Sequence, residues 1–191
     1  MENIKKQIKE MTVIAENIFG NTNLLSEIHS ISNLLKNAFL KKRKVLFCGN
    51  GGSAAQAQHL AAELSGKFKL DRRALPAEAC HLNTSFLTAV SNDYQFEKAY
   101  ERYIQAFGCE GDILIGLSTS GNSENIIRAF QAAQEIKITT VGFTGNSGGK
   151  LKNYSDFLVG IPSENVARIQ EMHLLIGHII CERVEYELFG K

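Results

Sequence analysis

The sequence contains no tryptophan, two prolines and no long apolar run, in an otherwise ordinary composition of 44% hydrophobic and 21% charged residues. Such a composition is typical of a soluble protein. No apolar stretch approaches the roughly 20 residues that a helix needs to cross a bilayer. The N-terminal segment MENIKKQIKEMTVIAENIF has no unbroken apolar core and no small-residue cleavage site, so it does not match a signal peptide. We therefore expect a cytoplasmic protein with no membrane partner.

Cysteine is scarce, and its spacing excludes two kinds of site. Cys48, Cys80, Cys109 and Cys181 stand singly, with no CxxC pair. A thiolate zinc site or a dithiol redox motif therefore has no support. Three of the four lie in apolar or β-like surroundings, which predicts small buried hydrophobic residues.

An excess of charge of either sign is also missing, since the formal net charge is +1. A nucleic-acid partner is not indicated at the level of the whole chain. The basic run at 41–44 stands where a helix is expected to end, and cations there complement the helix dipole. A length of 191 residues suits one domain, 1–191, with one well-filled core.

Two amphipathic helices are predicted ahead of the first strand, within residues 1–42. Apolar residues recur at three- and four-residue spacing over 3–19 and again over 24–40. A break, GNTN, separates the two runs. They suit packing against a second subunit, and a simple core role is equally compatible.

From residue 44 onward, short apolar strands alternate with helices. Strands are expected near 44–49, 77–82, 112–118, 137–144 and 155–161, and helices over 53–64, up to 107, over 126–134 and over 164–188. This alternation predicts a parallel sheet covered on both faces, with ligands at the carboxyl ends of its strands. The fold class is therefore α/β, a three-layer αβα sandwich with a five-stranded parallel sheet behind two N-terminal helices.

Two strands run into loops of small polar residues that lead into helices. The first is GNGGS at 49–53 and the second STSGNS at 118–123. Unpaired N–H groups at a helix N-terminus favour an anion, and the hydroxyl groups add donors for a phosphate. Such residues also serve as ordinary caps and turns, but two such loops on one sheet favour binding. A third segment, 91–93, is expected to be only a short polar break.

Polar residues on two helices suggest proton transfer or metal binding. His59 and Glu63 are four residues apart and project side by side. On the last helix, which also carries His173, Gln170 and His178 are two turns apart and roughly 80° out of line. A buried histidine on an apolar helix is more often a core residue than a ligand. One carboxylate, two imidazoles and one amide nevertheless suit a labile ion such as zinc, and acid–base chemistry.

At this point the chain resembles a known family, the bacterial phosphoheptose isomerases of the sugar isomerase (SIS) fold. The resemblance extends over nearly the whole chain and includes CGNGGSAAQAQHLAAEL, SND, GDILIGLSTSGNSENI, TGNSGGKL and RIQEMHLLIGHII. It implies isomerisation of sedoheptulose 7-phosphate to D-glycero-D-manno-heptose 7-phosphate, the first step in making heptose for lipopolysaccharide or capsule. It also implies a homotetramer whose active sites form between subunits.

The resemblance assigns roles to individual residues. It places one zinc ion per subunit on His59, Glu63, Gln170 and His178. It implies substrate contacts at Asn50, Gly51, Gly52, Glu63, Asn92, Asp93, Ser118, Thr119, Ser120, Ser123 and Gln170, with Ser53 as a neighbour. We expect Glu63 to take a proton to give a cis-enediol, and His178 to act as the acid.

Two other functions were weighed against the isomerase. A similar SIS-fold tetramer, which is not an enzyme, binds the bacterial replication initiator, but it lacks the glutamate and the second histidine found here as Glu63 and His178. A sugar-sensing module of a regulator comes attached to a DNA-binding domain, for which this chain has no room. One departure is Lys67, where many of these isomerases carry arginine, so the sugar specificity is less constrained than the reaction class.

Overall fold

The alternation of strands and helices predicted from residue 44 onward is confirmed in the structure, a computed structural model that describes residues 1–190. The two N-terminal helices are also present, each within two residues of its predicted bounds. In chain order the elements are α1 (Glu2–Gly20), α2 (Thr22–Leu40), β1 (Val45–Gly49), α3 (Gly52–Ser65), β2 (Ala77–Ala79), α4 (Thr84–Asp93), η1 (Phe96–Lys98), α5 (Ala99–Phe107), β3 (Ile113–Ser118), α6 (Glu124–Glu135), β4 (Thr139–Thr144), η2 (Leu151–Tyr154), β5 (Phe157–Gly160) and α7 (Val166–Phe189).

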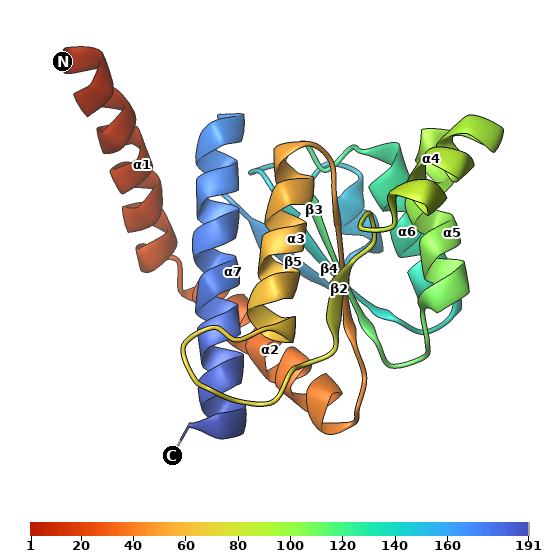
Figure 1. The fold of residues 1–191 in the computed structure, drawn as a ribbon. Coiled ribbons are helices and arrows are strands. Elements are labelled where there is room, and N and C mark those ends of the chain that lie inside the picture. Colours follow the sequence, from red (N-terminus) through yellow and green to blue (C-terminus); the bar gives the residue numbers. More distant parts are fainter. Residues whose placement is uncertain (191) are drawn as a thin grey trace.

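The five strands form one parallel sheet in the order β2-β1-β3-β4-β5. Helices α2, α3 and α7 cover one face, and α5 and α6 cover the other (Figure 1). Because successive side chains of a strand point to opposite faces, Phe47 joins the core under α3 and α7, and Leu46 joins the core under α6. The predicted three-layer αβα sandwich is confirmed.

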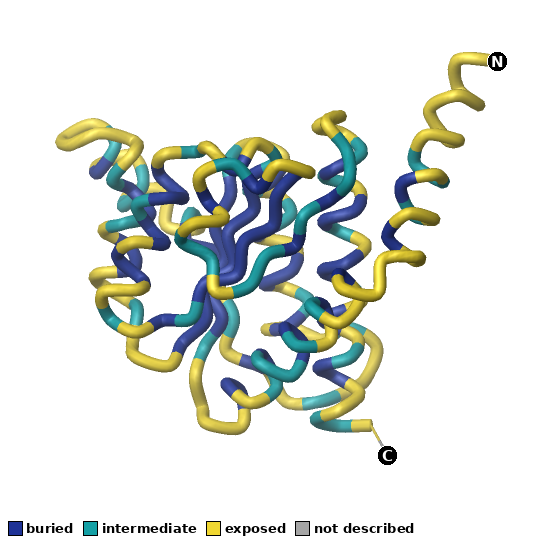
Figure 2. The backbone as a smooth tube through the Cα atoms, turned by 180° about the vertical axis from the view of Figure 1, so that it is seen from behind, coloured by how far each residue is buried: buried dark blue, intermediate teal, exposed yellow. Residues whose placement is uncertain are grey.

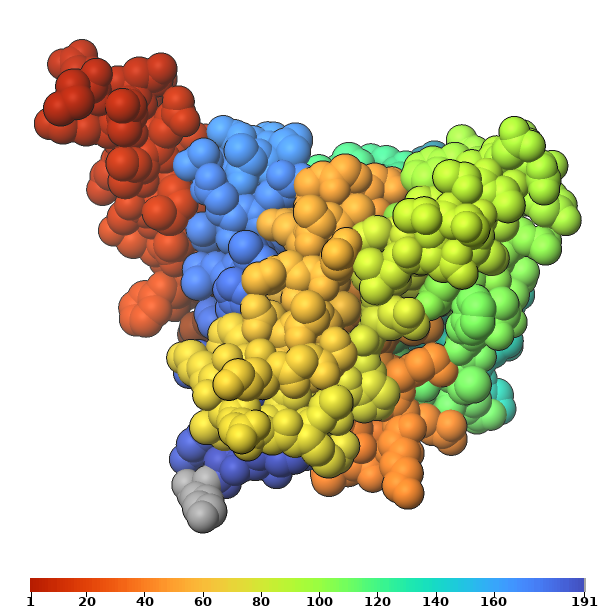
Figure 3. Space-filling model, in the orientation of Figure 1, coloured from red at the N-terminus to blue at the C-terminus, as the bar shows by residue number. Residues whose placement is uncertain are grey.

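The two N-terminal helices differ in how much of their apolar surface is buried. Helix α2 packs on α7 and β5, and Ile31 and Leu35 are fully buried there. Helix α1 projects from the body, as Figures 2 and 3 show. Only its second half reaches the core, through Ile14 and Ile18. A core role is therefore established for α2, while much of α1 stays exposed.

The carboxyl ends of all five strands lie at one edge of the sheet. From β1 the chain crosses first to β2 on one side and then to β3 on the other, so a topological switch point falls between β1 and β3. Ligands of open α/β sheets bind in the crevice at such a point. Both predicted phosphate loops start there. No helix among residues 1–190 is long and apolar enough to cross a bilayer.

The cysteines lie as the sequence predicts. Cys48, Cys80 and Cys181 are buried, and Cys109 is exposed. Burial raises the pKa of the Cys181 thiol to about 12, and it raises the pKa values of Cys48 and Cys80 well above the ordinary range. These three thiols therefore stay protonated and act as small core side chains.

A buried histidine gives the stability of the fold a specific pH dependence. His173 is fully buried against the Phe143 ring, and its Nε2 lies 3.1 Å from the Thr144 carbonyl oxygen. Burial lowers its pKa from 6.5 to about 4, although the hydrogen bond to Thr144 opposes the shift. Between these two pH values the unfolded chain binds more protons than the folded one. The stability contributed by neutral His173 is therefore complete above pH 6.5 and is lost as the pH falls toward 4.

We expect His173 to account for a loss of about 3 kcal/mol in the free energy of unfolding between pH 7 and pH 4. Urea titrations at several pH values measure it. Between pH 7 and pH 4, the free energy of unfolding of His173→Leu should fall by about 3 kcal/mol less than that of the parent protein. His29→Leu, at an exposed position on α2, should lose as much stability as the parent protein does. Parallel pH profiles for the parent and His173→Leu would contradict this prediction.

Candidate functional site

The loop after β1 leaves its backbone open to a ligand. Gly51 has a φ of +54°, a conformation that only glycine adopts without strain, and Gly51 and Gly52 are both exposed. A Cβ atom at Gly52 would lie 2.9 Å from the amide nitrogen of Gln170. Ser53, in the first turn of α3, is buried beneath this loop. The predicted residues 50–53 therefore form one tight turn at the N-terminus of α3.

The loop after β3 holds its hydroxyl groups together at the start of α6. The hydroxyl oxygens of Ser118 and Ser123 are 3.0 Å apart, and Ser120 is exposed. Ser123 is the N-cap residue, but its side chain accepts no hydrogen bond from the helix, so the first N–H groups of α6 stay available for an anion. Gly121, with φ +64°, packs directly against the backbone of the 145–149 loop. This rigid, hydroxyl-rich turn suits a phosphate.

A pair of amides joins the two loops. Asn50 and Asn125 exchange two side-chain hydrogen bonds, each 2.9 Å long, and Asn125 is buried. The side chain of Asn50 is thus engaged within the protein. Sequence reasoning did not find Asn125. The available signal was an amide in the first turn of an amphipathic helix, two residues after STSGNS.

His59, Glu63 and His178 form a cluster between α3 and α7. The two Nε2 atoms of the histidines are 2.9 Å apart, and Nε2 of His59 is 3.2 Å from Oε1 of Glu63. The helices approach closely here because Gly177 has no side chain, and a Cβ atom in its place would lie 2.6 Å from the Leu60 side chain. The structure therefore brings together the carboxylate and the imidazole that the sequence reasoning paired.

These three side chains have the donor set and the spacing of a metal site. Each offers one ligand atom, and the three atoms lie within 4.8 Å of one another. Ligand atoms held at about 2.1 Å from one tetrahedral Zn²⁺ are about 3.4 Å apart, close to the separations found here. His59 is exposed, and Glu63 and His178 are half-buried, so the cluster is open to solvent. The residues present fit a zinc ion.

Gln170 lies away from this cluster, beside the first loop. Its side-chain amide nitrogen is 3.4 Å from the Ser53 hydroxyl oxygen, and its backbone carbonyl oxygen accepts a 2.6 Å hydrogen bond from the Gln56 side chain. Eight residues separate it from His178, roughly 12 Å along the helix axis. The structure thus groups three of the four predicted metal-binding residues. It places Gln170 at the predicted substrate loop, and a metal role for its side chain stays a prediction.

The segment 91–93 differs from the predicted polar break. It forms the last turn of α4, because Asn83 caps that helix by accepting a hydrogen bond from the N–H of Phe86 and the helix runs on to Asp93. Asn92 and Asp93 are exposed and bond to each other. Figure 1 shows α4 on the side of the molecule away from α7. These two predicted substrate residues are therefore remote from His178 in the same chain.

Comparison with known proteins identifies the family. A model of the SIS domain matches residues 8–145. The phosphoheptose isomerase of Clostridium acetobutylicum is 53% identical over 98% of this chain and 96% of its own length. The chain belongs to the phosphoheptose isomerase family. The phosphoheptose isomerase of Sulfurimonas denitrificans is 46% identical over 98% of this chain and 96% of its own length.

Solved phosphoheptose isomerases share the whole architecture. The enzyme from Neisseria gonorrhoeae superposes with a TM-score of 0.90 at 36% identity, covering 96% of this chain and 97% of that one. The enzyme from Francisella tularensis gives 0.92 at 33% identity, with 96% of each chain covered. The chain is therefore an isomerase with the SIS fold, as the resemblance predicted.

Proposed function

We propose that this chain interconverts D-sedoheptulose 7-phosphate and D-glycero-D-manno-heptose 7-phosphate, the entry step to heptose for surface polysaccharides. The observation that carries the proposal is that Glu63 on α3 and His178 on α7 lie together in one solvent-open cluster. The N-terminus of α3 faces the switch point of the sheet. Family membership supplies the reaction class, and this cluster supplies the groups that the reaction needs.

The isomerisation moves one proton between two neighbouring carbons. Glu63, as a carboxylate, takes the proton from C1 of the ketose, which gives a cis-enediol, and then returns a proton to C2. His178 donates a proton to the C2 oxygen as its carbonyl is reduced to a hydroxyl, and it then takes the proton of the C1 hydroxyl as C1 becomes the carbonyl carbon. A carboxylate and an imidazole at one site suit these two roles.

The phosphate binds at the other end of the sugar. The N–H groups at the start of α6 and the hydroxyls of Ser118, Thr119, Ser120 and Ser123 provide donors for it. Along α3, Ser53 beside the first loop is six residues from His59, roughly 9 Å at 1.5 Å of rise per residue. The first loop can therefore contact the sugar between its phosphate and its reacting carbons. Binding energy from the phosphate then orients the reacting end.

His59, Glu63 and His178 are the residues that would hold Zn²⁺, one ion per subunit. Three protein ligands with a further open position are typical of a catalytic zinc site. Bound zinc would polarise the sugar carbonyl and stabilise negative charge on its oxygen. Glu63 and His178 then serve both as ligands and as proton carriers.

The proposed assembly is a homotetramer with active sites between subunits. Two observations support it. The N-terminal part of α1 projects from the body (Figure 3). Ile4 and Ile8 lie there one helical turn apart and are 61% and 56% exposed, an apolar surface that a second copy would cover. Asn92 and Asp93, which the resemblance assigns to the substrate, are exposed at the end of α4, on the side of the chain away from α7, so the site that they would complete is that of a neighbouring subunit.

The substitution Ile8→Asp tests this assembly. Removing one Ile side chain from an apolar interface costs about 1.5–3 kcal/mol in each subunit, so the variant should dissociate at concentrations at which the parent is tetrameric. Sedimentation velocity measures the mass. Lys9→Asp, at the neighbouring exposed position, provides the matched control and should stay assembled. A monomeric parent protein, or a tetrameric Ile8→Asp variant, would contradict the prediction.

One coupled assay on the purified protein tests the activity. The proposal requires turnover of sedoheptulose 7-phosphate, with formation of the aldose heptose phosphate. The initiator-binding alternative instead requires no turnover and measurable binding to the replication initiator. Turnover rejects the alternative, and its absence together with initiator binding rejects the isomerase.

A further inference from the structure

A buried ion pair lies beneath a surface segment next to the proposed site. Residues 66–74, which connect α3 to β2, are mostly exposed, yet the side chain of Arg72 is only 1% exposed. Its Nε donates a 2.9 Å hydrogen bond to Oε1 of Glu185 on α7, whose side chain is 2% exposed. The mechanism proposed above uses neither residue.

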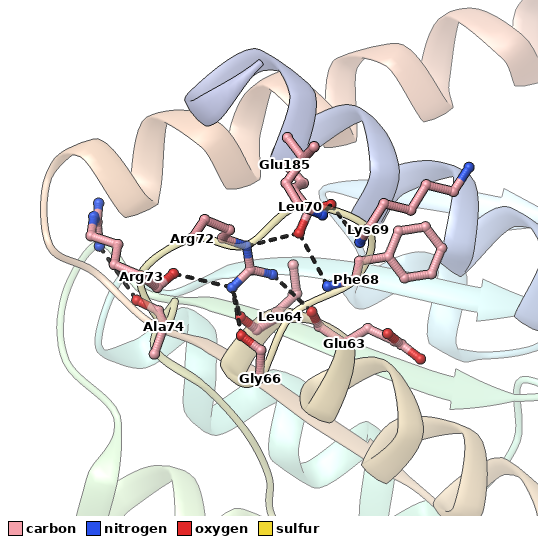
Figure 4. A network of polar contacts seen from close by, with 10 residues as sticks. All are labelled: Glu63, Leu64, Gly66, Phe68, Lys69, Leu70, Arg72, Arg73, Ala74 and Glu185. Carbon is pink, nitrogen blue, oxygen red and sulfur yellow. Dashed lines mark hydrogen bonds and ion pairs between the residues drawn. The ribbon is translucent and has the colours of Figure 1, made fainter. Parts of the chain in front are cut away.

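The other donors of Arg72 hold the end of α3. Its guanidinium donates to the backbone carbonyl oxygens of Glu63, Leu64 and Gly66, over 2.9, 2.8 and 2.9 Å (Figure 4). The last carbonyls of a helix have no partners within the helix, and a cation there also complements the dipole. Arg72 therefore fixes the turn of α3 from which the Glu63 side chain projects.

Glu185 holds the segment that follows. Its carboxylate accepts hydrogen bonds from the backbone N–H groups of Phe68, Lys69 and Leu70, at 3.1, 2.7 and 2.9 Å. Burial acts to raise the pKa of this carboxyl, but these three donors and Arg72 lower it overall, so Glu185 stays charged. The Phe68 ring, held in this way, lies 5.5 Å from the His178 ring.

Together, these contacts connect α3, residues 66–74 and α7 beside the cluster of His59, Glu63 and His178. Glu185 follows His178 by seven residues, two turns of α7, so both side chains lie on the same face of that helix. On α3, the carboxylate of Glu63 faces His59 while its carbonyl is bound by Arg72. We propose that Arg72, through its ion pair with Glu185, is a positioning residue that sets Glu63 and Phe68 against His178. This inference rests on the proposed function.

The chemistry of the pair fits positioning better than it fits stability alone. A buried ion pair contributes little net stability compared with apolar residues of the same volume, because both charges lose their hydration. Arginine offers five N–H donors in a fixed fork, which binds a carboxylate and several carbonyls at once. Lysine keeps the charge but cannot hold these acceptors in one fixed arrangement.

The test compares Arg72→Met and Arg72→Lys with Arg73→Met, a matched control at an exposed position, whose guanidinium donates to the Ala74 carbonyl oxygen and lies over the Phe189 ring. Zinc affinity by competition with a coloured chelator, kcat and KM, and thermal unfolding are measured for each. Arg72→Met should lower zinc affinity about 10- to 100-fold, as the loss of a residue that orients metal ligands does. The decrease in kcat should be larger than any change in KM. Arg72→Lys should fall in between, and Arg73→Met should match the parent.

The NMR signals of the His178 imidazole give a readout that depends neither on metal nor on turnover. They report the ring current of Phe68, so Arg72→Met should shift them and Arg73→Met should not. If Arg72→Met fails to fold, Arg72→Lys and Glu185→Gln carry the same comparison. A folded Arg72 variant with parental His178 signals and zinc affinity overturns the proposal. Absence of zinc binding and turnover in the parent instead refutes the proposed function, and the NMR comparison still decides the positioning role.

Discussion

Replacing Glu63 with glutamine is expected to lower kcat by about 10³-fold, within the range that a general base contributes, and to leave the fold intact. The amide has the size of the carboxylate but cannot take the proton from C1. The phosphate loops at 49–53 and 118–123 are untouched, so KM should change much less than kcat. The coupled assay gives both constants, and circular dichroism with sedimentation shows whether the variant folds and assembles.

Glu182→Gln provides the control for this experiment. Glu182 lies on α7 and pairs with Lys69 at the surface, with half of its side chain exposed, so the substitution should leave kcat unchanged. Zinc content separates the two roles of Glu63, since a metal-loaded but inactive Glu63→Gln points to the proton carrier and a metal-free one to the ligand. Parental turnover by Glu63→Gln would remove Glu63 from the mechanism altogether.

The fold was largely predictable because its elements are marked by local pattern. The central strands β1 and β3 are short apolar runs buried on both faces, and a parallel sheet with helices on both sides is the architecture that such runs form. For the N-terminal helices, the local pattern does not predict what each helix packs against. Their amphipathic spacing fitted a core helix and an interface helix equally, and only the packing of α2 on α7 and β5 decided for one of them.

The candidate site was predictable where the spacing of residues itself fixes geometry. His59 and Glu63 meet because they are four residues apart on one helix. Their contact with His178 depends on Gly177, which lets α3 approach α7, and no local pattern reports that approach. Arg72 was equally hidden, since a charged residue in a polar connection gives no sign that its side chain is buried. For Gln170, the rotation of roughly 80° along the helix leaves out the rise over eight residues, so its predicted metal role stays a prediction.

Removal of metal is expected to abolish most of the activity, and added Zn²⁺ to restore it. Three side chains of this chain converge on one point with nitrogen and oxygen ligands, and two of them are the proposed proton carriers. A cation there would hold the Glu63 carboxylate and the two imidazoles, whose Nε2 atoms lie 2.9 Å apart, in one arrangement. The measurement is kcat of chelator-treated protein before and after stoichiometric zinc, with metal content determined by elemental analysis.

The variant His59→Ala separates this effect from general damage by the chelator. It removes one predicted ligand that carries no proton in the mechanism, so zinc affinity should fall at least about 10-fold, more than for a residue that only orients a ligand. At saturating zinc some activity should return, because Glu63 and His178 are still present. His29→Ala, at an exposed histidine that bonds to Arg183, should behave as the parent. Full activity of metal-free parent protein would show that the cluster transfers protons without a metal, and the resemblance to a zinc site would then reflect only the spacing of an acid and a base.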